Sequence, residues 1–304
     1  MRIRARALPE ALRDIAIVGA GVAGLTTALC LARAGFRVRI FERAAAAQPV
    51  GAGIQLSPNA LRVMVRLGCL EALAARGTLA AAVTLRDGRT GRTLAKVPVQ
   101  AADGTPYLSI HRADLHSVLL DAALGNDAIT LSFGHTLTEV RETEAGVLLA
   151  FGADAHQFAL VVAADGVHSA VASGLGFAPP GLSPYAAWRF LRPAGNGEAG
   201  GIAAWLDARW HAVAYPVHAG NLLNLVVIAR TDFVAPDDSS PARLAGALSP
   251  HAAPGLVDII RDGTFVGCWP MSAVPATRPY ATGDRIVLVG DAAHGMLPFA
   301  AQGA

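Results

Sequence analysis

The sequence predicts an α/β fold in which a βαβ nucleotide-binding start is followed, later in the chain, by a β-rich part. Two observations carry this prediction. The opening stretch DIAIVGAGVAGLTTALCLARAGFRVRIFER runs from a β-branched segment through a glycine turn and an Ala/Leu helix into a second strand. Farther on, short apolar runs separated by turn residues fill residues 186–230. At 304 residues the chain is long enough for two domains.

Composition excludes several classes of protein. The chain is 53% hydrophobic and 16% charged, which rules out a disordered tail. Lys and Arg number 25 against 23 Asp and Glu, so bulk charge gives no reason to expect a nucleic-acid partner. The three cysteines, Cys30, Cys69 and Cys268, are odd in number and widely spaced. That usage predicts reduced thiols in a cytoplasmic protein, with no disulfide framework and no metal knuckle.

The mean hydropathy of +0.42 and an uncharged run over residues 15–32 raise the alternative of a membrane span. Three glycines and two threonines interrupt that run, so a buried strand followed by a helix fits it better. A signal peptide fits poorly, because Glu10 and Asp14 break up the basic start. We therefore expect no membrane association.

The remaining elements follow from local patterns. GAGIQLSPNALRVMVRLG predicts a glycine loop and then a helix capped by Ser57 and ended by Gly68. TLRDGRTGRTLAKVPV predicts a hairpin, and HRADLHSVLLDAAL a helix. Short strands follow to residue 164, and the Pro/Gly-rich FAPPGLSPY marks a domain crossing near residue 180. Beyond the β-rich stretch we expect a helical segment over 236–254 and then strands to the GDAAH sequence.

The strongest local motif is G-x-G-x-x-G, formed by Gly19, Gly21 and Gly24 between the first strand and its helix. Bare backbone there lets a pyrophosphate approach the helix N-terminus. Glu42 ends the second strand eighteen residues beyond Gly24, where a carboxylate can bind both hydroxyls of an adenosine ribose. The pattern predicts a Rossmann-like dinucleotide site but does not distinguish NAD from FAD. A turn that merely needs small residues is the plainer alternative.

Two further strands end in an acidic residue next to glycine. AADGVHSAV places Asp165 after an apolar strand, and RIVLVGDAAH places Asp291 after another. Either aspartate alone is explained by helix capping. Three strand-end devices in order are harder to explain by capping alone, because each of them puts a carboxylate or an open backbone at the same kind of crevice.

Taken in order, GAGVAG, GAGIQLSPNALRVMVRLG, HRADLHSVLL, ADGVHSAV and GDAAHGMLPFAAQGA resemble the class A flavoprotein monooxygenases. The likeness is to their salicylate hydroxylase-like branch, which has the p-hydroxybenzoate hydroxylase fold, and it runs from about residue 14 onward. It implies an FAD-binding domain of the glutathione-reductase type over 1–70, 107–180 and 270–304. It also implies a β-sheet substrate domain over 71–106 and 181–269.

The resemblance gives the dinucleotide-motif residues their roles. It implies that the three glycines hold the FAD pyrophosphate and that Glu42, with Arg43 beside it, holds the adenosine ribose. Arg112, in HRADL, corresponds to the family arginine that reaches the pyrophosphate; the alternative is an ordinary exposed arginine at a helix start.

The same resemblance places other residues around the flavin. It implies that Asp165 serves FAD and the nicotinamide donor and that Asp291 binds the ribityl chain. The loop at Ala52 and Gly53 runs beside the flavin ring, and Pro298 lines its reacting face.

His211 and Tyr215, in WHAVAYPV, are the candidate catalytic residues. A spacing of four in an extended strand puts both side chains on one face, and the related branch carries a His-x-x-x-Tyr pair at a similar place. A base that removes a phenolic proton makes the ring electron-rich for attack. The alternative is a His and a Tyr that merely cover a sheet or make core hydrogen bonds. The other histidines show no spacing typical of metal ligands, so we expect no metal site.

The implied activity is a single-component monooxygenase in which NADH or NADPH reduces FAD. One oxygen atom of O₂ then passes from a flavin C4a-hydroperoxide to a small aromatic acid or phenol. An epoxidase or non-aromatic hydroxylase on the same fold stays open. So does a non-catalytic FAD-binding fragment, because family members continue beyond the AQGA turn into a further helix. A homodimer is a family expectation only.

Overall fold

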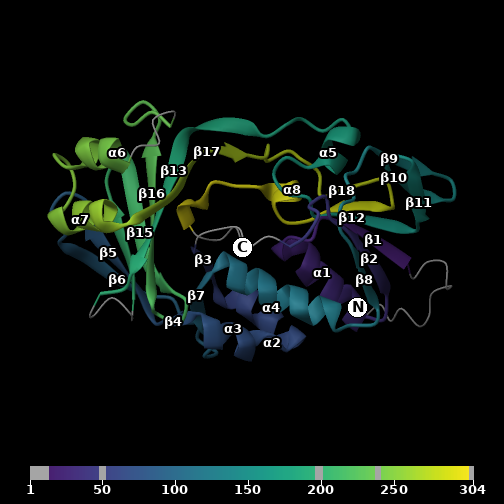
Figure 1. Cartoon of the computed structure of the whole chain (residues 1–304), viewed down its shortest axis with the longest axis horizontal. Coiled ribbons are helices and arrows are strands. Elements are labelled where there is room, and N and C mark those ends of the chain that lie inside the picture. Colours follow the sequence, from purple (N-terminus) through teal and green to yellow (C-terminus); the bar gives the residue numbers. More distant parts are fainter. Residues whose placement is uncertain (1–13, 48–52, 196–200, 237–240, 301–304) are drawn as a thin grey trace. The chain divides into compact units, whose positions relative to one another are not determined.

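The computed structural model describes residues 14–47, 53–195, 201–236 and 241–300, and these divide into two compact units (Figure 1). The first unit takes its residues from Met1–Pro49, His116–Gly181 and Ser272–Ala304. The second takes its residues from Val50–Leu115 and Leu182–Met271. The chain therefore crosses between them four times, as an interleaved architecture requires.

A six-stranded sheet organises the first unit, in the order β18-β19-β12-β1-β2-β8. Its β1, β2, β8, β12 and β19 all run parallel to their neighbours within that set, and β18 pairs antiparallel with β19. The strands are β1 (Asp14–Val18), β2 (Arg37–Phe41), β8 (Ile129–Ser132), β12 (Leu160–Ala163), β18 (Ala281–Thr282) and β19 (Ile286–Leu288). The predicted strand, turn, helix and strand at the start of the chain are confirmed.

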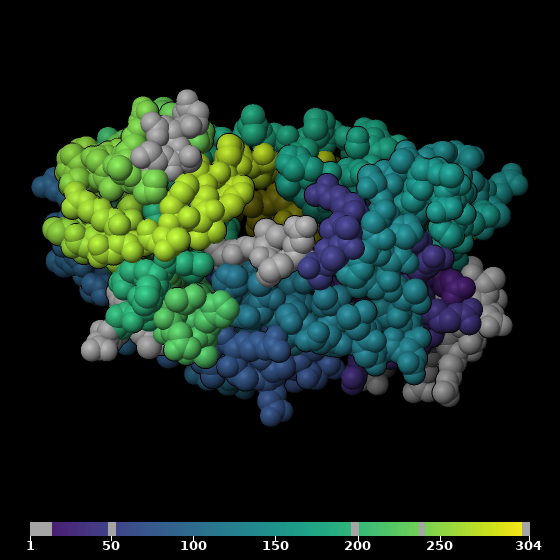
Figure 2. All heavy atoms as spheres, viewed as in Figure 1, coloured from purple at the N-terminus to yellow at the C-terminus, as the bar shows by residue number. Residues whose placement is uncertain are grey.

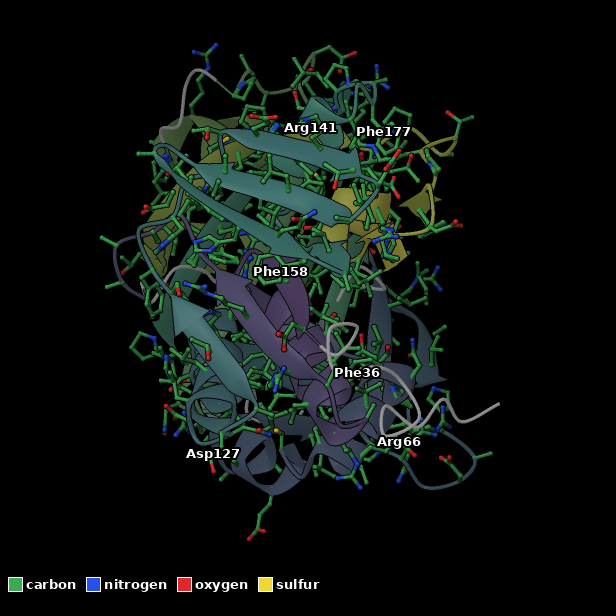
Figure 3. All side chains as sticks on the ribbon, turned by 90° about the vertical axis from the view of Figure 1, so that its right-hand side faces the viewer. Phe36, Arg66, Asp127, Arg141, Phe158 and Phe177 are labelled. Carbon is green, nitrogen blue, oxygen red and sulfur yellow. The ribbon has the colours of Figure 1, made fainter. Side chains whose placement is uncertain are left out.

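The first unit also holds a three-stranded antiparallel sheet, β11-β10-β9, onto which Figure 3 looks, with Arg141 on β9 and Phe158 on β11 labelled. Apolar residues of this sheet, Phe151 and Phe158 among them, form one core cluster with Phe41 of β2 and Val161 of β12. The remaining elements are α1 (Val22–Arg33), β9 (Glu139–Thr143), β10 (Gly146–Phe151), β11 (Asp154–Phe158), α5 (Ala170–Gly174), α8 (Asp291–His294) and the 3₁₀ turn η3 (Pro298–Ala300).

A seven-stranded sheet organises the second unit, in the order β17-β13-β16-β15-β14-β5-β6. A smaller sheet, β3-β7-β4, accompanies it. The large sheet contains β5 (Ala82–Asp87), β6 (Thr93–Pro98), β13 (Gly181–Pro193), β14 (Ile202–Leu206), β15 (Trp210–Val217), β16 (Leu222–Arg230) and β17 (Thr264–Ala273), and the small one β3 (Gly53–Leu56), β4 (Thr78–Ala80) and β7 (Tyr107–His111).

Helices α6 (Pro241–Leu248) and α7 (Pro254–Asp262) cover one face of the large sheet, burying Leu244 and Leu256 against Trp188 and Trp210. The green to yellow-green surface of Figure 2 belongs to this part of the chain. One helical segment was expected over 236–254, and α7 was not predicted, although its buried residues Leu256, Val257 and Ile260 recur at helical spacing. The other helices are α2 (Pro58–Leu67), α3 (Leu70–Arg76) and α4 (Arg112–Leu124).

The compact units divide the chain differently from the expected domains at two places. Residues 50–70 and 107–115 were expected in the FAD-binding domain, but both stretches group with the second unit. The reason is strand pairing, because β3 and β7 pair with each other and the Gly53 amide bonds to a residue of β16. Local motifs could not reveal this, since the contact joins residues 171 positions apart. The functional domain boundaries themselves stay a prediction.

Within the described residues no helix has the length and apolar character that a membrane crossing requires. The uncharged run over 15–32 instead forms most of β1, the glycine turn and most of α1.

Candidate functional site

Four neighbouring strand ends of the first unit carry the sequence-predicted cofactor residues. In the sheet order β19-β12-β1-β2, Asp291 follows β19 and Asp165 follows β12. Gly19 follows β1, and Glu42 follows β2. Because these four strands are parallel, their carboxyl ends share one edge of the sheet. That edge is where open α/β sheets bind their ligands.

Two glycines of the turn, Gly19 and Gly24, lie too close to neighbouring backbone for a side chain, whereas the third, Gly21, has space beside it. Gly19 has φ +103, and a Cβ there would lie 2.5 Å from the carbonyl oxygen of Ala164. A Cβ on Gly24 would lie 2.0 Å from the carbonyl oxygen of Gly19. A Cβ on Gly21 would meet no atom of the described residues within 4 Å, and Gly21 caps α1 without a side-chain hydrogen bond. Among the described residues there is open space beside Gly21 at the first turn of α1, a position where helix N-termini bind anions in other proteins.

Glu42 is held in place by two backbone amides. Its Oε2 accepts a hydrogen bond from the Ala20 N–H at 2.8 Å, and its Oε1 accepts one from the Ala44 N–H at 2.9 Å. The carboxylate is therefore fixed beside the glycine turn, with lone pairs remaining for hydroxyl donors. Arg43, beside it, is exposed.

The two carboxylate oxygens of Asp165 are in different situations. Its Oδ2 accepts from the Val171 N–H at 3.1 Å, near the start of α5, whose N-cap is Ser169. Its Oδ1 is buried and has no hydrogen-bond partner among the described residues. Asp291, by contrast, is exposed at the start of α8. Capping explains one oxygen of Asp165, and the second fits a ligand that donates a hydrogen bond.

Gly290 brings the Asp291 turn against the glycine motif. It has φ +57, and a Cβ there would lie 2.6 Å from the Cβ of Ala23 in α1. The turn after β19 is therefore packed directly on the first turn of α1. Pro298 lies farther on, exposed in η3.

Sequence reasoning missed Arg278, which supports this same turn. The side chain is only 7% exposed, donates from Nη1 to the carbonyl of Ala292 at 2.9 Å, and donates from Nη2 to the carbonyl of Ala178. Its Nε is buried without a partner among the described residues. A lone arginine in ATRPY carries no pattern that could have revealed it.

Replacing Arg278 with methionine is expected to lower the free energy of unfolding by about 2 kcal/mol, because the two carbonyls lose a charged donor. Chemical denaturation followed by circular dichroism measures the change. Arg285→Met is the matched control, since Arg285 donates a hydrogen bond of 3.3 Å at an exposed position. Equal stability of the two variants would contradict this account of Arg278.

In the second unit the sequence-predicted flavin loop rests on β15 and β16. The Gly53 N–H donates to Oδ1 of Asn224 at 2.8 Å, and a Cβ on Gly53 would lie 2.4 Å from the Tyr215 ring. Glycine is therefore required at that position. Asn224 is fully buried and was not predicted, since a single asparagine in a strand gives no signal. Ala52 lies outside the described residues.

His211 and Tyr215 share one face of β15, as their spacing predicts. The alternate residues of the same strand, Trp210, Ala212 and Ala214, belong to the core cluster that α6 and α7 cover, so the two candidates lie on the opposite face. Burial lowers the pKa of His211, which favours its neutral form. Burial raises the pKa of Tyr215, against the opposing effect of Arg189. The neutral imidazole can accept a proton, and the phenol stays a hydrogen-bond donor.

Arg112 begins α4 and is exposed, so its position also fits the alternative of an ordinary helix-start arginine.

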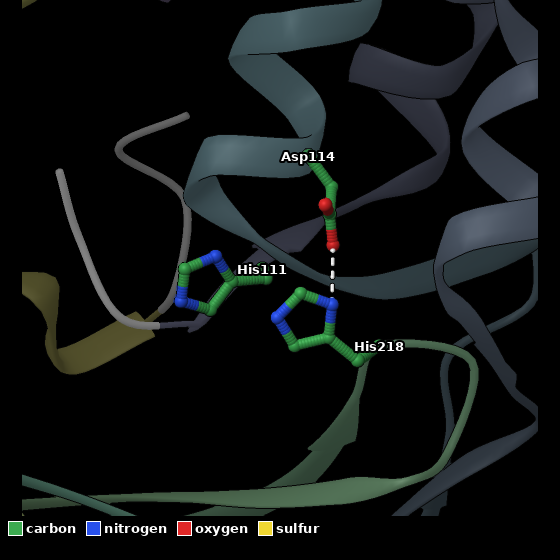
Figure 4. Close-up of side chains that lie close together, drawn as sticks. All are labelled: His111, Asp114 and His218. Carbon is green, nitrogen blue, oxygen red and sulfur yellow. Dashed lines mark ion pairs between the residues drawn. The ribbon is translucent and has the colours of Figure 1, made fainter. Parts of the chain in front are cut away.

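Two residues near Arg112 in sequence, His111 and Asp114, lie close to His218, which belongs to the turn after β15 (Figure 4). The Nδ1 of His218 is 3.1 Å from Oδ2 of Asp114, and the His111 and His218 rings stack 4.7 Å apart. No spacing rule could have predicted this group.

The three side chains offer donor atoms within 4.8 Å of one another, which is the composition of a metal site. One of these atoms is already engaged, because Nδ1 of His111 accepts from the Ala113 N–H at 3.3 Å. Rings stacked at an interplanar angle of 19° also direct their nitrogens poorly toward a shared ion. We interpret the group as a structural contact that links the start of α4 to the tip of the β15–β16 hairpin, next to Arg112.

Comparison with known proteins gives consistent matches. The family described as FAD binding domain matches residues 13–304. The 3-amino-4-hydroxybenzoate 2-monooxygenase of Streptomyces cremeus is 37% identical, over 95% of this chain and 74% of that protein. The 6-hydroxynicotinate 3-monooxygenase of Bordetella bronchiseptica is 34% identical, over 95% of this chain and 78% of its own length.

Among solved structures, a salicylate hydroxylase substrate complex superimposes with a TM-score of 0.80 at 22% identity, over 97% of this chain and 76% of that one. Klebsiella pneumoniae HpxO complexed with FAD and uric acid gives 0.80 at 24% identity, over 95% and 75%. Identities this low show the shared fold alone.

Proposed function

The chain belongs to the FAD-binding family of flavin-dependent aromatic monooxygenases, and on that premise we propose that it consumes NADH or NADPH to hydroxylate a small aromatic acid or phenol. The observation that most supports this proposal is the setting of Gly53. Its amide is hydrogen-bonded to Asn224, and an added Cβ would meet the Tyr215 ring, so the loop expected beside the flavin packs on the sheet face that also carries the candidate base, His211. We also propose that the reaction takes place in the cytoplasm, where NAD(P)H is available.

The residues at the strand ends fit FAD. We propose that the open backbone at Gly21 and the α1 N-terminus accept the pyrophosphate, with Arg112 as a bidentate partner. Glu42, fixed by two amides, would take the ribose hydroxyls, with Arg43 beside it. The unpartnered Oδ1 of Asp165 and the exposed carboxylate of Asp291 suit the hydroxyl-rich part of the cofactor.

Bound FAD would accept a hydride from NAD(P)H and activate O₂. The protein's own residues would control proton transfer and exclude water from the reaction. We propose that His211 takes the proton from the substrate hydroxyl, because its lowered pKa keeps the imidazole neutral. Tyr215, kept as a phenol by its raised pKa, would donate a hydrogen bond to the same oxygen, and Pro298 would line the reacting face.

The test is an absorption spectrum of the purified chain after incubation with FAD and removal of free flavin. Retained flavin bands that bleach with NADH or NADPH and recover in air are expected. Incubation with 3-amino-4-hydroxybenzoate, 3-hydroxybenzoate and 6-hydroxynicotinate under ¹⁸O₂ should then give a product with one labelled oxygen atom, measured by mass spectrometry.

Other outcomes discriminate between the alternatives. A chain that holds no flavin contradicts the proposal and favours a defective fragment. Flavin reduction with oxygen transfer only to alkenes favours an epoxidase. Glu42→Ala is the matched variant for the cofactor site, and it should lower FAD retention without altering the circular dichroism spectrum.

A further inference from the structure

Ala20, in the middle of the glycine turn, has both of its backbone polar groups bound by side chains from elsewhere in the chain. Its N–H donates to Oε2 of Glu42 at 2.8 Å. Its carbonyl oxygen lies 2.8 Å from Nε2 of His116, a half-buried residue of α4 that is 96 positions away. All three residues belong to the first unit. The turn is therefore held from two sides, by the residue that follows β2 and by α4.

The contact with Ala20 fixes a proton on one atom of the imidazole. A carbonyl oxygen only accepts hydrogen bonds, so Nε2 of His116 carries a proton and is the donor. The preceding residue of the turn is held as well, because the Gly19 N–H donates to the carbonyl of Phe41 at 2.8 Å. Three backbone groups of the turn thus have defined partners.

The N–H of Gly21 is the next polar group of the turn, and it has no acceptor among the described residues. The peptide bond between Ala20 and Gly21 is trans, so its N–H points opposite to its carbonyl. Because the carbonyl faces His116, the Gly21 N–H faces away from that side chain at the first turn of α1. It is a donor at the helix end where anions bind.

The turn's own residues do not fix the direction of this peptide. Glycine adopts a wide range of backbone conformations, so rotation about the bonds on either side of the Ala20–Gly21 peptide can turn it over. A reversed peptide would present its carbonyl oxygen where the N–H now lies, and that oxygen would repel a pyrophosphate. The hydrogen bond from His116 opposes the reversal. Glu42 cannot do so, because it binds the preceding peptide.

We propose that His116 is a positioning residue for the cofactor, because its hydrogen bond to the Ala20 carbonyl keeps the Gly21 N–H directed at the FAD pyrophosphate. The inference rests on the proposed function and deepens it by naming the side chain that sets the direction of a pyrophosphate donor. His116 acts through the backbone and does not contact the cofactor. Only Arg112 of HRADLHSVLL was expected to serve FAD, so this assignment gives the same segment a second task.

Two amide variants of His116 test whether the hydrogen bond carries the effect. Glutamine can place an N–H near the position of the imidazole Nε2, whereas the asparagine amide is about 1.5 Å shorter. FAD binding to the flavin-free protein is measured by quenching of flavin fluorescence, and circular dichroism checks the fold. His116→Asn should weaken FAD binding about 10-fold, and His116→Gln should stay within about threefold of the wild type.

ADP and adenosine, used as competitors of FAD, test where the effect is exerted. ADP carries two linked phosphates and adenosine carries none. His116→Asn should weaken ADP binding about as much as FAD binding and change adenosine binding less than about threefold. Ser117→Asn is the matched control, because it puts the same amide at the next position of α4, where Ser117 donates to Asp121. It should bind all three ligands as the wild type does.

Three outcomes would overturn the assignment. They are wild-type FAD affinity in His116→Asn, equal weakening in His116→Asn and His116→Gln, and equal loss of ADP and adenosine. If His116→Asn does not fold, His116→Gln decides, and FAD binding more than about threefold weaker than that of the wild type overturns the assignment.

Failure of the proposed function has a different signature, because these measurements require no turnover. A wild type that binds no FAD refutes the proposed function before any variant is compared. A wild type that binds FAD without forming an oxygenated product refutes the hydroxylase, and a loss confined to His116→Asn would still support the role of His116.

Discussion

Replacing Gly24 with alanine should abolish FAD retention and lower the free energy of unfolding by about 3 kcal/mol. The added Cβ would lie 2.0 Å from the carbonyl oxygen of Gly19, which is backbone and cannot rotate away. Either α1 must move from β1 or the turn must open, and both changes displace the amides that would face the pyrophosphate. Thermal unfolding and flavin absorbance of the same sample measure the two effects.

Two matched glycine variants separate folding from binding in this experiment. A Cβ on Gly21 meets no atom of the described residues within 4 Å, so Gly21→Ala should unfold as the wild type does while binding FAD more weakly, because the methyl group would occupy the space proposed for the pyrophosphate. Gly255, at the start of α7, is equally open and distant in sequence, so Gly255→Ala should change neither property. If Gly24→Ala retains flavin as well as Gly255→Ala does, the glycine turn does not bind the cofactor.

The cofactor half of the site could be predicted because its signals are local. The glycine turn, Glu42 and the two aspartates each follow a recognisable strand, and parallel pairing of neighbouring strands then brings them to one edge. The His211 and Tyr215 pair was predictable in the same way, since alternation along one strand fixes their common face. The likeness to a known family added roles to residues that periodicity had already placed.

The supporting residues could not be predicted, because long-range contacts define them. Asn224 bonds to an amide 171 residues away, and Arg278 bonds to a carbonyl 100 residues away. Neither has a neighbour in sequence that hints at its partner. The expected domain limits differ from the compact units for the same reason.

His211→Gln should lower the rate of hydroxylation about 100-fold while leaving FAD retention unchanged. Glutamine keeps polar atoms on this face of β15 but cannot accept the proton from the substrate hydroxyl at neutral pH. Product formation per NADH consumed should also fall, because a ring that keeps its phenolic proton reacts slowly with the activated oxygen. Liquid chromatography of product and oxygraph measurement of O₂ uptake give both quantities.

The pH dependence tests the same assignment with a definite sign. Burial places the pKa of His211 below its ordinary value of 6.5, so the neutral base persists as pH falls through 6.5. The acidic limb of the hydroxylation rate should therefore begin below pH 6.5 and disappear in His211→Gln. At pH values between the lowered pKa of folded His211 and 6.5, the unfolded chain binds more protons than the folded chain. The stability contributed by neutral His211 is therefore present above pH 6.5 and decreases as the pH is lowered through that range.

His251→Gln is the matched control for this prediction, since His251 is a half-buried histidine of the same unit whose ring lies tilted against Phe233, outside the candidate site. It should keep the wild-type rate and the wild-type acidic limb. Unchanged coupled hydroxylation in His211→Gln would instead remove His211 from the mechanism. The proton would then have to leave through Tyr215, whose raised pKa keeps it a protonated phenol and so a poor base at neutral pH.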